Sequence, residues 1–218
     1  MPILRAAAVL LTILGLSAAA PRAQSGSSPA DVAARIQAHY ASVRDFEADF
    51  TLEQSSGLTP QSAVDKGHVL VKKPGRMRWT FQTGNRSEVV SDGVEIYAYF
   101  PKDKYVQVTP FPKPGDRSTA LLYLTGRGDL TRDFAASQPD APSPSGEVRV
   151  TLKPKTPQSD FVSLTLGVDA RSLIWRTLVI VDDQGGVRTF TFTNLRENRG
   201  IPDRAFEFAI PRGVDIRR

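Results

Sequence analysis

DFEADFTLE, residues 45–53, is the stretch that decides the fold, because apolar and polar residues alternate strictly along it. Phe46, Ala48, Phe50 and Leu52 are separated from one another by charged residues or threonine. A period of two residues is typical of a β-strand with one face on a core and the other in water. The sequence therefore predicts that a half-buried strand begins here.

A helix is predicted immediately before this strand. Ser28 suits the N-cap position, Pro29 the first helical position, and Asp31 the positive end of the helix dipole. The apolar residues that follow recur at spacings of four, four and three: Val32, Ile36, Tyr40 and Val43. Such spacing places them on one side of a helix, so we expect one face of this helix to be buried.

Short strands separated by turn residues are predicted over most of the remaining chain. They cover 67–73, 77–81, 94–100, 105–109, 147–153, 161–168, 173–181, 187–195 and 205–210. Connections such as Lys73-Pro74-Gly75 are too short to join anything but antiparallel neighbours, so we expect a meander. Together with 45–53 this makes about ten strands, which must curl or close to hide an apolar face.

Two helical segments and one loop interrupt these strands. Residues 118–124 are almost entirely apolar, and 129–134 have a weaker helical pattern. The proline- and serine-rich stretch 138–146 cannot join a sheet. We expect the apolar segment to face the sheet and the proline-rich stretch to be an exposed loop.

The composition excludes several classes of protein. The chain has 218 residues, 28 Lys plus Arg against 23 Asp plus Glu, and no cysteine. Without cysteine there is no disulfide framework, no thiolate metal site, no cysteine nucleophile and no lipid-modified N-terminal cysteine. A nucleic-acid groove requires a dense basic run with interleaved aromatic residues. The sequence has none, so we expect no nucleic-acid partner.

The first 23 residues have the pattern of a signal peptide. Arg5 is followed by an uncharged apolar run, 6–16, that is too short to span a bilayer comfortably. The small residues that come next allow cleavage after Ala19 or after Ala23, and the sequence does not decide between them. We therefore expect an exported protein with no permanent membrane anchor, whose residues 24–218 form one domain.

Residues that would support catalysis or metal binding are sparse. The two histidines, His39 and His68, lie beside no nucleophile motif, and the sequence contains no G-x-S-x-G stretch. Asp182-Asp183 belongs to a DDQGG stretch, which predicts a tight hairpin turn rather than a metal site. We expect no enzymatic activity, no metal and no cofactor.

Four segments, in order along the chain, resemble a known family. They are YASVRDFEADF at 40–50, VKKPGRMRW at 71–79, VSDG at 90–93, and 198–215, which begins with NRGIPD. Together they resemble the periplasmic outer-membrane lipoprotein carrier family (LolA type). The resemblance implies a mainly β fold with some α: an incomplete, strongly curved antiparallel β-barrel covered by a helical lid over a hydrophobic cavity.

The resemblance also implies a function. The family accepts acylated lipoproteins from an inner-membrane ABC-type lipoprotein-releasing complex and delivers them to an outer-membrane lipoprotein receptor. We expect a periplasmic monomer with this task. Three alternatives stay open: the same scaffold binding another envelope lipid or acting as a lipoprotein or lipid sensor, an exported hydrolase, and a structural envelope protein.

A cavity of this kind would be lined by apolar residues of the strands and the lid. The candidates are Val69, Val71, Met77, Trp79, Phe81, Val90, Ile96 and Ala98 from the strands, with Leu121, Leu122 and Leu124 from the lid. Met77 also suits ordinary core packing.

One basic residue is a candidate latch for the lid. In the family, a basic residue just before the proline of the turn holds the lid shut through hydrogen bonds to helix backbone. That position is Lys73 in this sequence. Lysine carries a compact ammonium instead of the planar guanidinium of arginine, so a latch made by Lys73 would be looser. The alternative is that Lys73 is a solvated turn residue.

Overall fold

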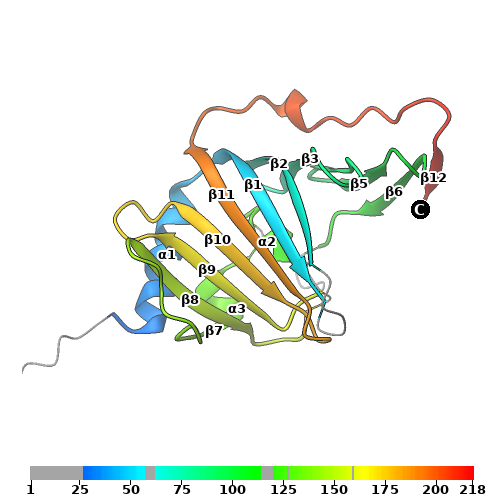
Figure 1. Ribbon diagram of the computed structural model, residues 1–218. Coiled ribbons are helices and arrows are strands. Elements are labelled where there is room, and N and C mark those ends of the chain that lie inside the picture. Colours follow the sequence, from blue (N-terminus) through cyan, green and yellow to red (C-terminus); the bar gives the residue numbers. More distant parts are fainter. Residues whose placement is uncertain (1–26, 57–61, 114–119, 127, 159) are drawn as a thin grey trace, which may run out of the picture.

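The computed structural model describes residues 27–56, 62–113, 120–126, 128–158 and 160–218 (Figure 1). The helices are α1 (Pro29–Ser42), α2 (Ala120–Tyr123), α3 (Leu130–Asp133) and the 3-10 helix η1 (Asp203–Phe206). The strands are β1 (Asp45–Ser55), β2 (Ser62–Lys72), β3 (Arg76–Phe81), β4 (Glu88–Asp92), β5 (Glu95–Phe100), β6 (Tyr105–Pro110), β7 (Phe134–Ser137), β8 (Glu147–Pro154), β9 (Ser163–Asp169), β10 (Trp175–Val181), β11 (Val187–Glu197) and β12 (Asp215–Arg217).

The described strands form a single 12-stranded sheet that curves around the helices (Figure 1). Its order is β12-β6-β5-β4-β3-β2-β1-β11-β10-β9-β8-β7, so β1 lies between β2 and β11. Neighbours pair antiparallel except β12 and β6, which pair in parallel. The sheet ends at β12 and β7 without closing. This confirms the predicted incomplete, mainly antiparallel barrel.

The capping pattern explains why α1 begins where it does. The Ser28 hydroxyl accepts a hydrogen bond from the Asp31 backbone N–H at 3.1 Å, and the Asp31 carboxylate accepts one from the Ser28 backbone N–H at 3.1 Å. Pro29 occupies the first turn, where no backbone donor is needed. The predicted stripe is buried, with Ile36 and Tyr40 at 0% and 5% exposure. The predicted helix is therefore confirmed.

β1 confirms the prediction made from residues 45–53. Its inward residues are buried, and it pairs along its whole length with β2, from Asp45 opposite Lys72 to Ser55 opposite Ser62. The tight turn predicted at Asp182 joins β10 to β11. There the Asp182 carboxylate accepts hydrogen bonds from the backbone N–H groups of Gln184 at 3.0 Å and Gly186 at 2.7 Å.

The structure contains three short strands that the sequence pattern does not predict: β4, β7 and β12. β4 contains only two adjacent apolar residues, Val89 and Val90, and runs into the turn sequence Ser91-Asp92-Gly93, so it has no alternation that would predict a strand. β7 follows α3 directly and pairs with β8. The helical segment predicted at 129–134 is present as α3, and that at 118–124 as α2, although 118 and 119 lie outside the described residues.

The strand predicted at 205–210 is wrong. These residues belong to the C-terminal arm, residues 198–214, which contains η1 and runs along the sheet to β12 (Figure 1). Phe206 is buried at 1% exposure, and the Phe208 ring stacks on Tyr97 with centroids 5.4 Å apart. The alternation of phenylalanines therefore reflects contacts with the sheet below. Arg78, rather than a neighbouring strand, donates hydrogen bonds to the Ala205 and Glu207 carbonyl oxygens.

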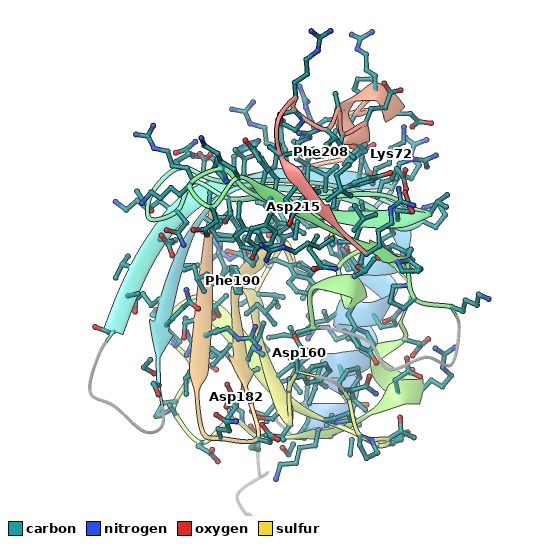
Figure 2. The ribbon with its side chains drawn as sticks, turned by 90° about the vertical axis from the view of Figure 1, so that its right-hand side faces the viewer. Lys72, Asp160, Asp182, Phe190, Phe208 and Asp215 are labelled. Carbon is teal, nitrogen blue, oxygen red and sulfur yellow. The ribbon has the colours of Figure 1, made fainter. Side chains whose placement is uncertain are left out.

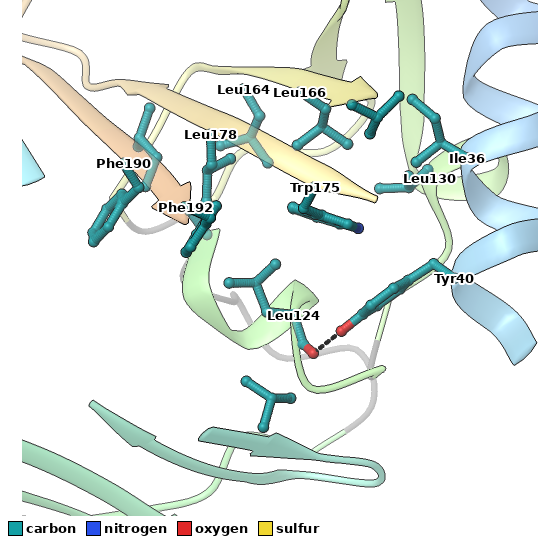
Figure 3. Packing of buried hydrophobic residues seen from close by; sticks show 14 of the residues in the cluster. Ile36, Tyr40, Leu124, Leu130, Leu164, Leu166, Trp175, Leu178, Phe190 and Phe192 are labelled. Carbon is teal, nitrogen blue, oxygen red and sulfur yellow. Dashed lines mark hydrogen bonds between the residues drawn. The ribbon is translucent and has the colours of Figure 1, made fainter. Parts of the chain in front are cut away.

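The main core lies between the sheet and the helices (Figure 3). We call the side of the sheet that carries Phe50 and Trp79 the inner face, and the opposite side the outer face. Residues directly opposite on paired strands share a face. On the inner face, side chains of β1, β2, β3 and β8 to β11 pack with those of α1, α2 and α3. The C-terminal arm covers part of the outer face, because Phe208 stacks on Tyr97 there.

Candidate functional site

Most of the residues predicted to line a cavity lie together on the inner face. Val69 is opposite Trp79, and Val71 is opposite Met77, so these side chains project from the same side. All of them are almost fully buried. The apolar cluster that they form also contains Phe81, Ile96 and Leu124. The β2–β3 candidates therefore share one buried apolar face.

Four candidates need separate treatment. Val90 is opposite Arg78, whereas Val89 is opposite Trp79, so Val90 faces away from the other candidates and is buried on the outer face. The sequence analysis therefore chose the residue next to the correct one, Val90 instead of Val89, because β4 itself was not predicted. Ala98 is opposite Val89 and shares the inner face. Leu121 and Leu122 belong to α2, but their side chains lie outside the described residues.

Sequence reasoning missed an aromatic group at the centre of the inner face. The Phe50 and Trp79 ring centroids are 5.1 Å apart, those of Trp79 and Phe190 5.3 Å, and those of Phe50 and Phe190 5.9 Å. Phe192 extends this group along β11. These phenylalanines belong to the alternating apolar patterns of β1 and β11, so each was predictable as an inward residue. Only the pairing of β1 with β11, far apart in sequence, shows that they meet.

A glycine makes room for this aromatic group. Gly67 is opposite both Phe50 and Phe81. A Cβ at this position would lie 2.3 Å from the Thr80 carbonyl oxygen and 2.5 Å from the Phe50 Cζ atom. Any side chain would therefore displace the Phe50 ring. The inner face is thus a broad aromatic and aliphatic surface that suits flexible hydrocarbon.

Lys73 joins the sheet to the helices that cover it. Its Nζ donates a hydrogen bond to the Tyr40 carbonyl oxygen at the end of α1 and lies 3.4 Å from the centroid of the Tyr40 ring. A Cβ on Gly126 would lie 2.7 Å from the Lys73 Cδ atom, so the lysine stem packs against the turn after α2. Lys73 is half-buried and contacts both helical segments.

Two further hydrogen bonds hold the turn after α2 against this position. The Tyr40 hydroxyl donates to the Leu124 carbonyl oxygen (Figure 3), and the Gly75 backbone N–H donates to the Thr125 carbonyl oxygen at 3.1 Å. Burial lowers the pKa of Lys73 to about 8, while the nearby Glu197 carboxylate raises it. Burial raises the pKa of the Tyr40 hydroxyl, which therefore stays protonated as a donor.

Comparison with known proteins identifies the family. The family model for the outer membrane lipoprotein carrier protein LolA matches residues 41–209. The chain belongs to the LolA family. An outer-membrane lipoprotein carrier protein of Chromohalobacter salexigens is 32% identical over 187 residues, which cover 85% of this chain and 86% of that protein.

A second relative and one solved structure are also similar to this LolA-family chain. An outer-membrane lipoprotein carrier protein of Hahella chejuensis is 28% identical over 211 residues, 96% of each chain. The crystal structure of an uncharacterized conserved protein from Thermus thermophilus matches with a TM-score of 0.51 at 11% identity, over 86% of this chain and 99% of that one. The structural match shows a shared fold only.

In this LolA-family chain, α2 is also held at its beginning. The Asp160 carboxylate accepts a hydrogen bond from the Ala120 backbone N–H at 3.3 Å. Arg188 on β11 donates to the Asp160 carbonyl oxygen at 2.9 Å, and its Nη2 lies 3.6 Å from the Asp160 carboxylate. Burial raises the pKa of Asp160, and Arg188 opposes the shift. Polar contacts therefore anchor α2 and the turn after it at both ends.

Both histidines lie within hydrogen-bond distance of a carboxylate in this LolA-family structure. His39 Nε2 lies 3.0 Å from the Glu197 carboxylate, and His68 Nδ1 lies 2.9 Å from the Asp49 carboxylate. Asn194 donates to the other Asp49 oxygen at 2.8 Å; these contacts lower the pKa of Asp49. Within the described ranges, no three His, Cys, Asp or Glu residues are grouped so as to hold a metal ion. No described helix is long and apolar enough to cross a membrane.

Proposed function

We propose that this protein carries acylated lipoproteins through the periplasm without chemical catalysis. It would receive them from an inner-membrane ABC-type lipoprotein-releasing complex and deliver them to an outer-membrane lipoprotein receptor. The observation that carries the proposal is the combination of an extended apolar inner face with covering helices that are joined to the sheet through the contacts of Lys73 and Tyr40. Membership of the LolA family supports it independently.

The energetics of an acyl chain explain the need for such a carrier. Burying one methylene group stabilises a lipid by about 0.8 kcal/mol, so a chain of about 15 methylenes is held in a membrane by about 12 kcal/mol. Passage of an unshielded chain through water is correspondingly slow. A protein that takes the acyl chain directly from the membrane and passes it directly to the receptor keeps the chain out of water and avoids that barrier.

Lys73 is proposed to be the latch of the helical lid. Its ammonium contacts the end of α1, and its stem contacts the turn after α2, so opening must break or move these contacts. Acyl chains compete with the covering helices for the same inner face. Their burial would offset the loss of the Lys73 contacts, so cargo would open the lid.

The N-terminal segment is proposed to direct export. Residues 1–23 would act as a signal peptide, with cleavage after Ala19 or after Ala23, and residues 24–218 would form the mature domain, a monomer in the periplasm. The mass of the protein purified from the periplasm decides between the two cleavage sites. Recovery of the uncleaved chain in the membrane fraction would contradict the proposal.

The test of the carrier function uses spheroplasts that contain newly made lipoproteins. We expect the purified protein to release an acylated lipoprotein into the soluble fraction as a one-to-one complex. A lipoprotein whose acceptor cysteine is replaced by serine serves as the control, because it carries no acyl chain. Absence of a soluble complex, with another lipid bound to the same protein in native mass spectrometry, would overturn the transport proposal.

A further inference from the structure

The inner face changes from apolar to polar at one end of β1 and β11. Along β1, the inward Phe50 and Leu52 are followed by Gln54; along β11, Arg188 stands two residues before Phe190. Leu52 is opposite Phe190 and Gln54 is opposite Arg188, so these side chains share one face. Residues two apart on a strand are about 7 Å apart. The change from hydrocarbon-like to polar surface is therefore abrupt.

A pocket of about 280 Å³ lies over this change. Leu52, Phe81 and Phe190 are the apolar residues that line it, and its polar lining consists of Gln54, Asp65, Thr83, Asn85, Ser87 and Arg188. Figure 2 shows Phe190 within the sheet, above Asp182 in the β10–β11 turn, with Asp160 beside it toward the helices. A pocket with this lining fits a ligand that joins hydrocarbon directly to polar groups.

Several hydrogen-bond donors at this pocket are free to meet a ligand. Arg188 uses its Nη2 atom for Asp160, and its guanidinium has further N–H groups. The side-chain amides of Gln54 and Asn85 make no hydrogen bond within the part of the chain that the structure describes. Three side chains with hydrogen-bond donors therefore lie beside the apolar residues of this pocket.

We propose that this pocket binds the glyceryl diester of an acylated ligand. The ester carbonyl oxygens would accept hydrogen bonds from Arg188 and Gln54, while the acyl chains continue along Leu52, Phe190 and Phe50. Ester carbonyls are acceptors only, and leaving them unpaired in an apolar site is costly, so donors at the boundary favour this chemistry. The inference rests on the proposed function as an acyl-chain carrier.

The test compares two probes that differ only in the ester carbonyls. One is a synthetic peptide with an N-terminal dipalmitoylglyceryl-cysteine, and the other is its dihexadecyl ether analogue. Binding is measured by isothermal titration with the full chain as purified from the periplasm. We expect the diester to bind about tenfold more tightly than the diether, which corresponds to about one charge-assisted hydrogen bond.

Variants identify the donors. Arg188→Met and Gln54→Leu should each reduce the ratio of diester affinity to diether affinity severalfold. Gln54→Leu has no described hydrogen bond to lose, so it tests the pocket even if Arg188→Met weakens the fold. Arg176→Met is the matched control, because Arg176 is exposed, pairs with Asp169 at 3.0 Å and does not line the pocket.

The outcomes separate this inference from the proposed function. Equal binding of both probes by the unaltered protein, or a preference that survives both variants, would overturn the diester site but leave an acyl-chain carrier. Binding of neither probe would overturn the carrier function itself. Phosphatidylglycerol is the third probe: binding tighter than that of the lipopeptide, lost in Arg188→Met but kept in Gln54→Leu, would show that Arg188 pairs with the phosphate and would overturn the diester site.

Discussion

Lys73 makes two contacts with Tyr40: its Nζ donates a hydrogen bond to the Tyr40 carbonyl oxygen, and the same atom lies 3.4 Å from the centroid of the Tyr40 ring. The Tyr40 hydroxyl in turn donates to the Leu124 carbonyl oxygen. One lysine therefore ties the β2–β3 turn to α1, and through Tyr40 to the turn after α2. Replacing Lys73 or Tyr40 should therefore weaken the packing of the helices against the sheet.

Lys73→Leu should destabilise the closed protein. The variant loses a hydrogen bond to backbone and a cation–π contact while keeping an apolar stem, so we expect the free energy of unfolding to fall by about 1–2 kcal/mol. Urea denaturation measures this change, and hydrogen exchange should increase at the amides of α2. Lys104→Leu, on an exposed turn, is the control and should change neither quantity. Unaltered exchange in α2 would exclude Lys73 as a latch.

The stability of the protein should depend on pH through Lys73. Its pKa falls from 10.5 to about 8 on folding, because burial disfavours the ammonium. Between about pH 8 and pH 10.5 the unfolded chain therefore holds a proton that the folded chain has released, so the free energy of unfolding rises with pH in this window. The side chain is half exposed, and water reduces the gain to about 1 kcal/mol.

Lys73→Met provides the reference for this pH dependence, because methionine does not titrate. We expect the stability of the unaltered protein relative to Lys73→Met to increase from pH 7.5 to pH 10, measured by urea denaturation. Effects of other groups that titrate in this range are common to both proteins. A difference that stays constant, or falls with pH, would contradict the lowered pKa of Lys73.

Gly67→Ala should disturb the aromatic group of the inner face. The added Cβ would lie 2.5 Å from the Phe50 Cζ atom and 2.3 Å from the Thr80 carbonyl oxygen, so the ring or the strand must move. We expect a loss of stability of about 1–3 kcal/mol, measured by thermal denaturation, and weaker binding of a fluorescent acyl probe. Val64→Ala, at an exposed position of the same strand on the outer face, should leave both properties unchanged. Normal probe binding by Gly67→Ala would show that Phe50 is not part of the acyl surface.

Arg78→Met should release the C-terminal arm, residues 198–214. Arg78 donates to the Ala205 carbonyl oxygen at 2.7 Å and to the Glu207 carbonyl oxygen at 2.6 Å. Without these bonds we expect faster hydrogen exchange throughout the arm and a loss of about 2 kcal/mol in the free energy of unfolding. Arg176→Met is the control, because its ion pair is exposed. The idea fails if exchange in the arm is the same in both variants.

Much of the fold could be predicted from the sequence, and the two errors, at the C-terminal arm and at Val90, each have a physical explanation. Capping residues and strict alternation identified α1, β1 and most other strands, because these signals depend only on neighbouring residues. The arm was mistaken for a strand because Phe206 and Phe208 alternate like strand residues, although their partners lie on the sheet below. Val90 was placed on the inner face because β4 was not recognised. A shift of one residue reverses every side chain of a strand.

The sequence by itself determined the class of fold, the buried face of α1, the turns between strands and the apolar residues of β2 and β3. These depend on periodicity and turn chemistry within short stretches of chain. Only the tertiary structure decided that Phe50 meets Phe190, that Lys73 contacts Tyr40, and that Gln54 and Arg188 stand together at the polar end of the inner face. Each of these contacts joins segments far apart in sequence. The pairing of β1 with β11 brings Phe50 to Phe190 and Gln54 to Arg188, and the packing of α1 against the β2–β3 turn brings Lys73 to Tyr40.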